Sequence, residues 1–250
     1  MASTCCYRLN HMDVNKQIAY TLNLLRPHQV LGYTKRRVGN KHHNAHVILD
    51  HVSQIRHVIS LDATDNLEFD LWFANQGCNI IRYDVQPASF SHEKFQFVQS
   101  QVGPGSGQTC LSELLQRHKL TDNHNLLLNS NLKGTEWSAL SRVTSDWHAH
   151  FQQMVWQFHD LHNLADAAFR DWVYQIWEQI TRTHVVCHVH ANQADVTWVS
   201  GVAVPPVIQV SFVRRDLGIC VPSAEQFIHK WHTACMENHV AVPLGTFTFI

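Results

Sequence analysis

The stretch LLLNSNLKGTEW, residues 126–137, joins an apolar run to a set of polar side chains. The run at 126–128 is typical of a buried strand, and residues that follow such a strand in a parallel sheet lie at its ligand-binding edge. The residues that follow it are Asn129, Ser130, Asn131 and Lys133. None of these side chains is acidic, and an amide can hydrogen-bond but cannot serve as a general base. The stretch therefore predicts a pocket that keeps hydrogen-bonding groups and lacks acid–base chemistry.

Other side chains that could do chemistry lie near the ends of predicted strands and helices. Asp84 ends a strand, where an acid either binds ribose hydroxyls or caps the following turn, and both interpretations stay open. Glu136 falls in the first turn of a predicted helix, where a carboxylate also complements the helix dipole. A metal site built from His159, His162 and His190 is conceivable, but structural histidines are more common, so we expect no metal.

Alternating strands and helices position these candidates. Strands are expected near residues 57–61, 79–83, 95–102, 126–130, 153–158, 184–190 and 207–214. Helices are expected over 13–25, 66–77, 110–118, 164–182 and 223–235, with a further one in 133–141. The alternation predicts a three-layer α/β fold, with a mostly parallel sheet covered by helices on both faces. No helix separates the last two strands, so we expect them to be mutually antiparallel.

Composition narrows the classes of function. The 250 residues suffice for a single domain at 1–250, with an N-terminal helical extension at 1–26 and a C-terminal helix and extended tail at 217–250. The net charge is −1, so we expect no nucleic-acid binding, and no apolar stretch is long enough to span a membrane. Seven scattered cysteines without a CxxC motif are typical of reduced thiols and favour a cytoplasmic compartment.

Seven short motifs carry a resemblance to a known family. They are RVGNKH at 37–42, DLWFANQGC at 70–78, YD at 83–84, LKGTEW at 132–137, FHDL at 158–161, VHAN at 189–192 and VSFVRRD at 210–216. In this order the chain resembles the FkbM-like S-adenosylmethionine-dependent methyltransferases. The resemblance implies a Rossmann-like class I methyltransferase fold, in which the cofactor and the acceptor bind at the carboxyl ends of the strands.

The chain departs from this family at the positions that carry chemistry. The family has a glycine-containing cofactor loop where this chain has Asp62 and Thr64, and Asp84 stands at the ribose-binding position. The resemblance places the candidate catalytic positions at Asn131, Lys133, Glu136 and His159. Asn131 and Lys133 replace acidic residues of the family. Glutamates expected from the family are likewise replaced at Gln157 and Gln209, so carboxylates have become amides or a lysine.

Two hypotheses about function follow from these departures. The favoured one is a non-catalytic or strongly divergent methyltransferase-fold protein that binds a small-molecule ligand or a protein partner. S-adenosylmethionine is then expected to bind weakly or not at all, because Asp62 and Thr64 stand where glycines would let the backbone approach the cofactor. The alternative is an active O-methyltransferase that acts on a sugar or another hydroxylated acceptor. Surplus aromatic residues of helix 164–182, such as Trp172, offer a partner surface, although aromatic stripes are more often core.

Overall fold

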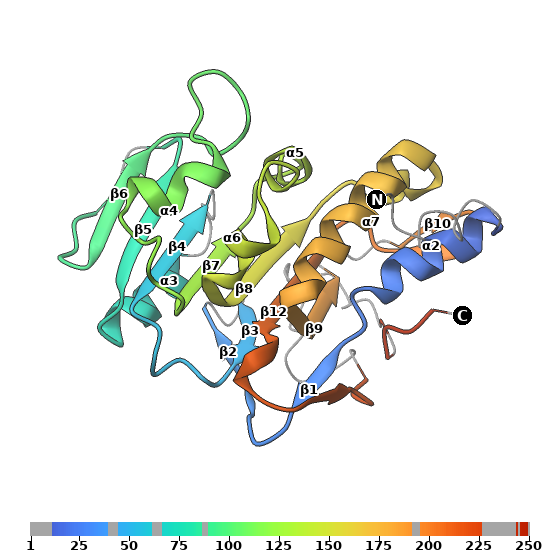
Figure 1. Ribbon diagram of the computed structural model, residues 1–250, viewed down its shortest axis with the longest axis horizontal. Coiled ribbons are helices and arrows are strands. Elements are labelled where there is room, and N and C mark those ends of the chain that lie inside the picture. The colour runs from blue at the N-terminus through green and yellow to red at the C-terminus, as the bar shows by residue number, and fades with distance from the viewer. Residues whose placement is uncertain are drawn as a thin grey trace.

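The architecture is known from a computed structural model that describes residues 12–39, 45–61, 67–86, 90–191, 196–226, 244 and 246–249. Its centre is a seven-stranded sheet with the strand order β6-β5-β4-β7-β8-β12-β9 (Figure 1). In chain order these strands are β4 (His57–Leu61), β5 (Asn79–Asp84), β6 (Phe95–Gln99), β7 (Leu126–Ser130), β8 (Phe151–Phe158), β9 (His184–Ala191) and β12 (Ile208–Arg214). All seven strands expected from the sequence are therefore members of one sheet.

Strand direction divides the sheet into two parts. Strands β6, β5, β4, β7 and β8 are mutually parallel, whereas β12 runs antiparallel to both β8 and β9. The expected antiparallel relation of the last two strands is confirmed, and β12 lies between β8 and β9. The chain moves outward from β4 to β5 on one side and returns to β7 on the other. This reversal of strand order creates a switch point between β4 and β7.

Both faces of the sheet are covered, as a mostly parallel sheet requires. One face packs against α2 (Val14–Asn23), α5 (Glu136–Leu140), α7 (Ala167–Thr183) and the turn made by η1 (Leu111–Glu113) with α4 (Leu114–Arg117). The other face packs against α3 (Leu67–Asn75) and against the hairpin formed by β2 (Lys35–Val38) and β3 (His46–Leu49). The arrangement is a mixed α/β fold with three layers (Figure 1).

Helix α7 shows why these segments fold as they do. Its buried residues recur at helical spacing and include Val173, Ile176, Trp177 and Ile180. Trp177 packs edge-on against Phe158 of β8, with ring centroids 5.5 Å apart. Asp166 caps the helix by accepting a hydrogen bond from the Phe169 backbone N–H at 2.8 Å. Trp172 of the same helix is exposed, so it remains available as a partner contact.

The smaller elements complete and in places revise the expected set. They are α6 (Ser145–Ala149), η2 (Leu161–Ala165), η3 (Arg215–Leu217), β1 (His28–Val30), β10 (Thr197–Val199), β11 (Val202–Val204) and β13 (Cys220–Pro222). Most of the helix expected at 223–235 lies outside the described residues, and 223–226 are not helical. Helix α2 packs Ile18 and Leu22 into the main core. In the described part of the chain, no helix combines the length and apolar character needed to cross a membrane.

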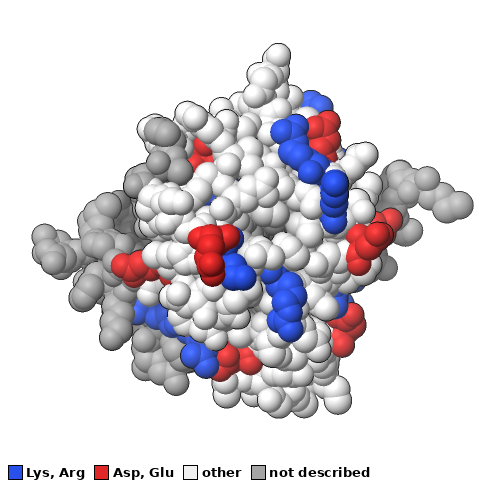
Figure 2. All heavy atoms as spheres, turned by 90° about the vertical axis from the view of Figure 1, so that its left-hand side faces the viewer, with Lys and Arg blue, Asp and Glu red and all other residues white. Residues whose placement is uncertain are grey.

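Surface charge is mixed on the face that Figure 2 shows, which is the β6 end of the sheet. Acidic and basic side chains are interspersed there, and neither sign forms a continuous field. This distribution agrees with the near-zero net charge of the sequence. It gives that face no electrostatic footprint for a polyanion.

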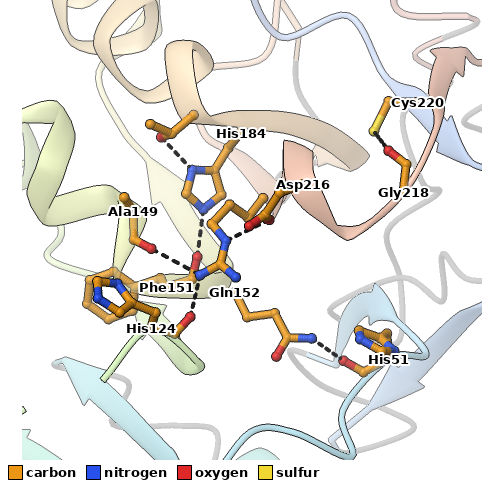
Figure 3. Close-up of polar contacts among 11 residues, drawn as sticks. His51, His124, Ala149, Phe151, Gln152, His184, Asp216, Gly218 and Cys220 are labelled. Atoms are coloured by element: carbon orange, nitrogen blue, oxygen red, sulfur yellow. Dashed lines mark hydrogen bonds and ion pairs between the residues drawn. The ribbon is translucent and has the colours of Figure 1, made fainter. Parts of the chain in front are cut away.

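The amino-terminal edge of the parallel strands is closed by polar contacts (Figure 3). Arg214, at the end of β12, donates to the carbonyl oxygens of His124 and Ala149 and forms an ion pair with Asp216 at 2.7 Å. His184, at the start of β9, donates from Nε2 to the Phe151 carbonyl at 2.9 Å. These contacts satisfy backbone groups where strands begin or end.

Two histidines at this edge are buried. Burial lowers the pKa of His184 to about 4, although its hydrogen bond to the Phe151 carbonyl acts in the opposite direction. Burial also lowers the pKa of His148 to about 3, and Nδ1 of His148 has no hydrogen-bond partner among the described residues. The unfolded chain takes up these protons near pH 6.5, before the folded chain does. Their contribution makes stability fall as the pH drops from about 6.5 towards 4.

We expect the substitution His148→Leu to reduce this acid sensitivity. It removes one group that is protonated only in the unfolded state. The slope of unfolding free energy against pH should therefore decrease by about 1.4 kcal/mol per pH unit near pH 5. Urea denaturation at pH 5.0, 6.0 and 7.0 measures the slope. His162→Leu, at an exposed histidine, is the matched control, and equal slopes in the two variants would contradict the assignment.

Candidate functional site

The candidate site lies at the carboxyl edge, defined here by the carboxyl ends of β4, β5, β7, β8 and β9 and the amino end of β12. Open α/β sheets bind ligands at this edge, beside the switch point. The switch point lies where Leu61 of β4 pairs with Ser130 of β7. The Asn131 backbone N–H extends this pairing by donating to the Leu61 carbonyl at 3.0 Å. The segment at 126–137 therefore reaches the carboxyl edge, where the sequence predicts it.

A row of polar side chains crosses the carboxyl edge. Gln157 of β8 lies directly opposite Gln209 of β12, and Gln209 in turn lies opposite His190 of β9. His46 of β3 reaches the same row and donates from Nδ1 to the Gln209 amide oxygen at 2.7 Å. All four side chains are buried. The two positions where the family resemblance implies glutamates thus face each other as amides.

Gln157, Gln209 and His46 carry no charge at neutral pH. Burial lowers the pKa of His46 to about 4, in spite of its hydrogen bond to Gln209. Opposite residues of an antiparallel pair have Cβ atoms about 5 Å apart. Two carboxylates at that distance would raise one another's pKa or require a cation between them. Two amides have neither requirement, which explains physically how both positions can be buried together.

Asn129 and Asn131 each carry one amide atom without a hydrogen-bond partner among the described residues. Nδ2 of Asn129 and Oδ1 of Asn131 are inaccessible to solvent and have no partner among the described residues. Buried polar groups are normally paired with protein, water or a ligand. Lys133 differs from both, because its side chain is exposed. The edge therefore offers amide donors and acceptors inside and a lysine outside.

Glu136 joins the loops that follow β7 and β8. Its carboxylate is 0% exposed and accepts the Gly134 backbone N–H at 2.7 Å and the His159 backbone N–H at 2.6 Å. The same carboxylate lies 3.0 Å from Nδ1 of His159. Trp137 completes the connection by donating from Nε1 to the His159 carbonyl at 3.0 Å. We call these contacts the Glu136 clasp.

The backbone around the clasp is conformationally constrained. Lys133 and Asp160 are non-glycine residues in the left-handed region, with φ of 51° and 63°. Gly134 has φ of 101°, and a side chain there would come within 3.0 Å of Asp160 Oδ2. For the non-glycine residues Lys133 and Asp160, each of these conformations costs about 1–3 kcal/mol and persists where the surrounding structure holds it. The clasp supplies that support and fixes the two loops against each other.

A buried ionic network lies beneath the ends of β4 and β5. Asp70 of α3 is 0% exposed, pairs with Arg82 at 2.5 Å and accepts a hydrogen bond from Ser60 at 2.5 Å. Burial raises the pKa of Asp70, although Arg82 acts in the opposite direction. Arg82 also approaches Asp84 at 3.7 Å. Asp84 accepts the Gln86 backbone N–H at 2.9 Å, so it does cap the following turn.

The structure brings together some of the residues singled out from the sequence and not others. Glu136 and His159 are in contact, and Asn131 directly follows β7. Asp62 and Thr64 lie outside the described residues. His159, His162 and His190 do not form a potential metal-binding group, and among the described residues no three side chains of this kind do. Asp84, for which the sequence left a ligand contact and a turn cap open, uses one of its oxygens in its own turn.

Three site residues were missed by sequence reasoning. His46, Asp70 and Arg82 contribute to the carboxyl edge through contacts distant in the sequence. The sequence did contain one signal of the buried ion pair, because Arg82 interrupts the apolar strand at 79–83. A charged residue inside a buried strand requires a buried partner. The identity of that partner was not contained in the local pattern.

We expect Asp70→Ala to lower stability by about 3–5 kcal/mol, because it leaves the Arg82 guanidinium buried without its main partner. The double variant Asp70→Leu/Arg82→Met removes both charges and should lose less than the single variant. Equilibrium urea denaturation at pH 7 measures both. A larger loss in the double variant than in Asp70→Ala would show that the ion pair is not the dominant interaction.

We also expect Gln209→Glu to raise the pKa of His46 from about 4 to above its usual range, because a buried carboxylate would then face the imidazole. The control Gln209→Met removes the hydrogen bond and should leave the pKa low, since burial is its main cause. A proton NMR titration of His46 follows the change. An unaltered pKa in Gln209→Glu would mean that the two side chains are not in contact in solution.

Comparison with known proteins adds no assignment to this geometry. No protein-family model matches the chain, and a search of the curated proteins found no significant similarity. The function of the carboxyl edge therefore has to be argued from its own residues.

Proposed function

We propose that this protein binds a small, uncharged, hydroxylated molecule at the carboxyl edge and does not transfer a methyl group. The observation that carries the proposal is the pairing of Gln157 with Gln209 inside the buried row. Amides supply donors and acceptors for neutral ligands, whereas they neither take up protons near neutral pH nor bind hard cations well. Nδ2 of Asn129 and Oδ1 of Asn131, which lack a partner among the described residues, add further buried hydrogen-bonding capacity beside the switch point.

The sheet order supports a methyltransferase-like origin for this binding fold. Strands β6-β5-β4-β7-β8 follow the 3-2-1-4-5 order of doubly wound folds. Insertion of the antiparallel β12 before β9 fits the class I methyltransferase layout that the sequence resemblance implies. We propose on this basis a Rossmann-like class I scaffold of the FkbM-like type. The cofactor and the acid–base groups are the parts that we infer to have diverged.

The second candidate function is O-methyl transfer to a hydroxylated acceptor. The contact between Glu136 and His159 favours it, because a carboxylate-oriented imidazole can accept the proton of a hydroxyl group. S-adenosylmethionine would supply the methyl group in such a reaction. Against this candidate, the Glu136 carboxylate is 0% exposed and already accepts three hydrogen bonds, so it cannot itself reach an acceptor as a base. The change from acids to Asn131 and Lys133 acts in the same direction.

One set of assays separates the two candidates. The unmodified protein is incubated with S-adenosylmethionine and, in turn, methyl α-glucoside, myo-inositol and catechol. We expect at least one of these compounds to raise the melting temperature, and no release of S-adenosylhomocysteine above the blank. Release of S-adenosylhomocysteine by the unmodified chain would refute the binding proposal and support O-methyl transfer.

The double variant Asn131→Asp/Lys133→Glu introduces acids at the two positions where the sequence resemblance implies them, and serves as the matched control. Lys133 is exposed and Asn131 half-buried, so the variant should fold, with a stability change of about half a kcal/mol for each surface-like substitution. We expect it to remain inactive, because the residues at 62 and 64 are unchanged. Turnover that is present in the unmodified chain and abolished in this variant would assign catalysis to Asn131 and Lys133.

A further inference from the structure

The Glu136 clasp determines which nitrogen of His159 carries the proton. An ionised carboxylate can only accept hydrogen bonds, so Nδ1 of His159, 3.0 Å from Glu136, must be the donor. In a neutral imidazole the other nitrogen, Nε2, is then an acceptor with a free lone pair. The backbone N–H groups of Gly134 and His159 also donate to this carboxylate.

Nε2 of His159 is both unpaired and accessible. No hydrogen bond to this atom occurs among the described residues, and it is not one of the buried atoms that lack a partner. The side chain as a whole is 18% exposed, against 0% for Glu136 behind it. The imidazole therefore has one nitrogen held inside the protein and the other open to solvent at the carboxyl edge.

The position of this ring is also fixed. The backbone of His159 is held on its N–H by Glu136 and on its carbonyl by Trp137. The next residue, Asp160, is in the left-handed region and abuts Gly134 of the neighbouring loop. A polar group that is held rigidly, with a single defined tautomer, is the usual arrangement for a group that contacts a ligand.

We propose that His159 accepts a hydrogen bond through Nε2 from a hydroxyl group of the molecule bound at the carboxyl edge, with Glu136 as its positioning residue. This inference rests on the proposed function and specifies how the ligand is recognised. It selects ligands that carry a hydroxyl donor over analogues in which that hydroxyl is methylated or absent.

The first test concerns the free protein and needs no ligand. Two-dimensional ¹⁵N–¹H spectra of the imidazole at pH 7.5 should show His159 with a protonated Nδ1 and an unprotonated Nε2. In Glu136→Gln the amide can offer an N–H towards the ring, so Nδ1 should lose its fixed donor role and the tautomer should shift. His150 is an internal control, because its Nδ1 contacts the backbone carbonyl of Asn123 and not a carboxylate. A protonated Nε2 in the unmodified protein overturns the inference.

The second test uses His159→Asn, in which the amide N–H can still donate to Glu136 and nothing replaces Nε2. Calorimetry with methyl α-glucoside, myo-inositol and catechol should show about tenfold weaker binding for the probe that stabilises the unmodified protein, equivalent to about 1.4 kcal/mol. The melting temperature of the free variant reports whether it remains folded. His162→Asn, at an exposed histidine two residues beyond Asp160, should bind as the unmodified protein does.

The outcomes separate this inference from the proposed function. If none of the three probes stabilises the unmodified protein, the proposed function fails and His159 loses its ligand role with it. If a probe binds the unmodified protein and a folded His159→Asn equally well, the proposed function stands and the inference fails. If His159→Asn does not fold, Glu136→Gln is measured instead, and undiminished probe binding together with a shifted tautomer overturns the inference.

Discussion

The structure depends on the burial of a mostly parallel sheet on both of its faces. Helices α4, α5 and α7 cover one face, and α3 with the β2–β3 hairpin covers the other. A charged side chain in a buried strand must then be paired, as Arg82 of β5 is with Asp70 of α3. Ligands of open α/β sheets bind at the carboxyl ends of the strands. The carboxyl edge is therefore the natural place for a site.

Two kinds of polar arrangement occur at that edge, and they have different consequences. In the Glu136 clasp a buried carboxylate holds two loops together. It accepts hydrogen bonds from the backbone and from Nδ1 of His159, and leaves Nε2 of that ring for a ligand. The facing side chains of Gln157 and Gln209 are neutral amides, so the repulsion that paired acids would bring is absent. The first arrangement gives the site rigidity, and the second gives it hydrogen bonds without acid–base function.

The sequence resemblance implies acids at the positions of Asn131, Gln157 and Gln209, but it does not show how these positions lie relative to one another. That Gln157 and Gln209 face each other, with His46 donating to Gln209, required the register of β8 with β12 and the position of β3. Asn131, by contrast, follows β7 and makes no hydrogen bond with either glutamine among the described residues.

The sequence by itself determined the strands, the parallel core and the antiparallel final pair, because apolar runs and the absence of an intervening helix are local signals. It also placed Asn131 and Glu136 near a strand end. Only the tertiary structure decided that Glu136 binds the backbone and ring of His159, 23 residues away, and that His46 meets Gln209 across 163 residues. Such pairings depend on strand order and register, which periodicity within a segment does not encode.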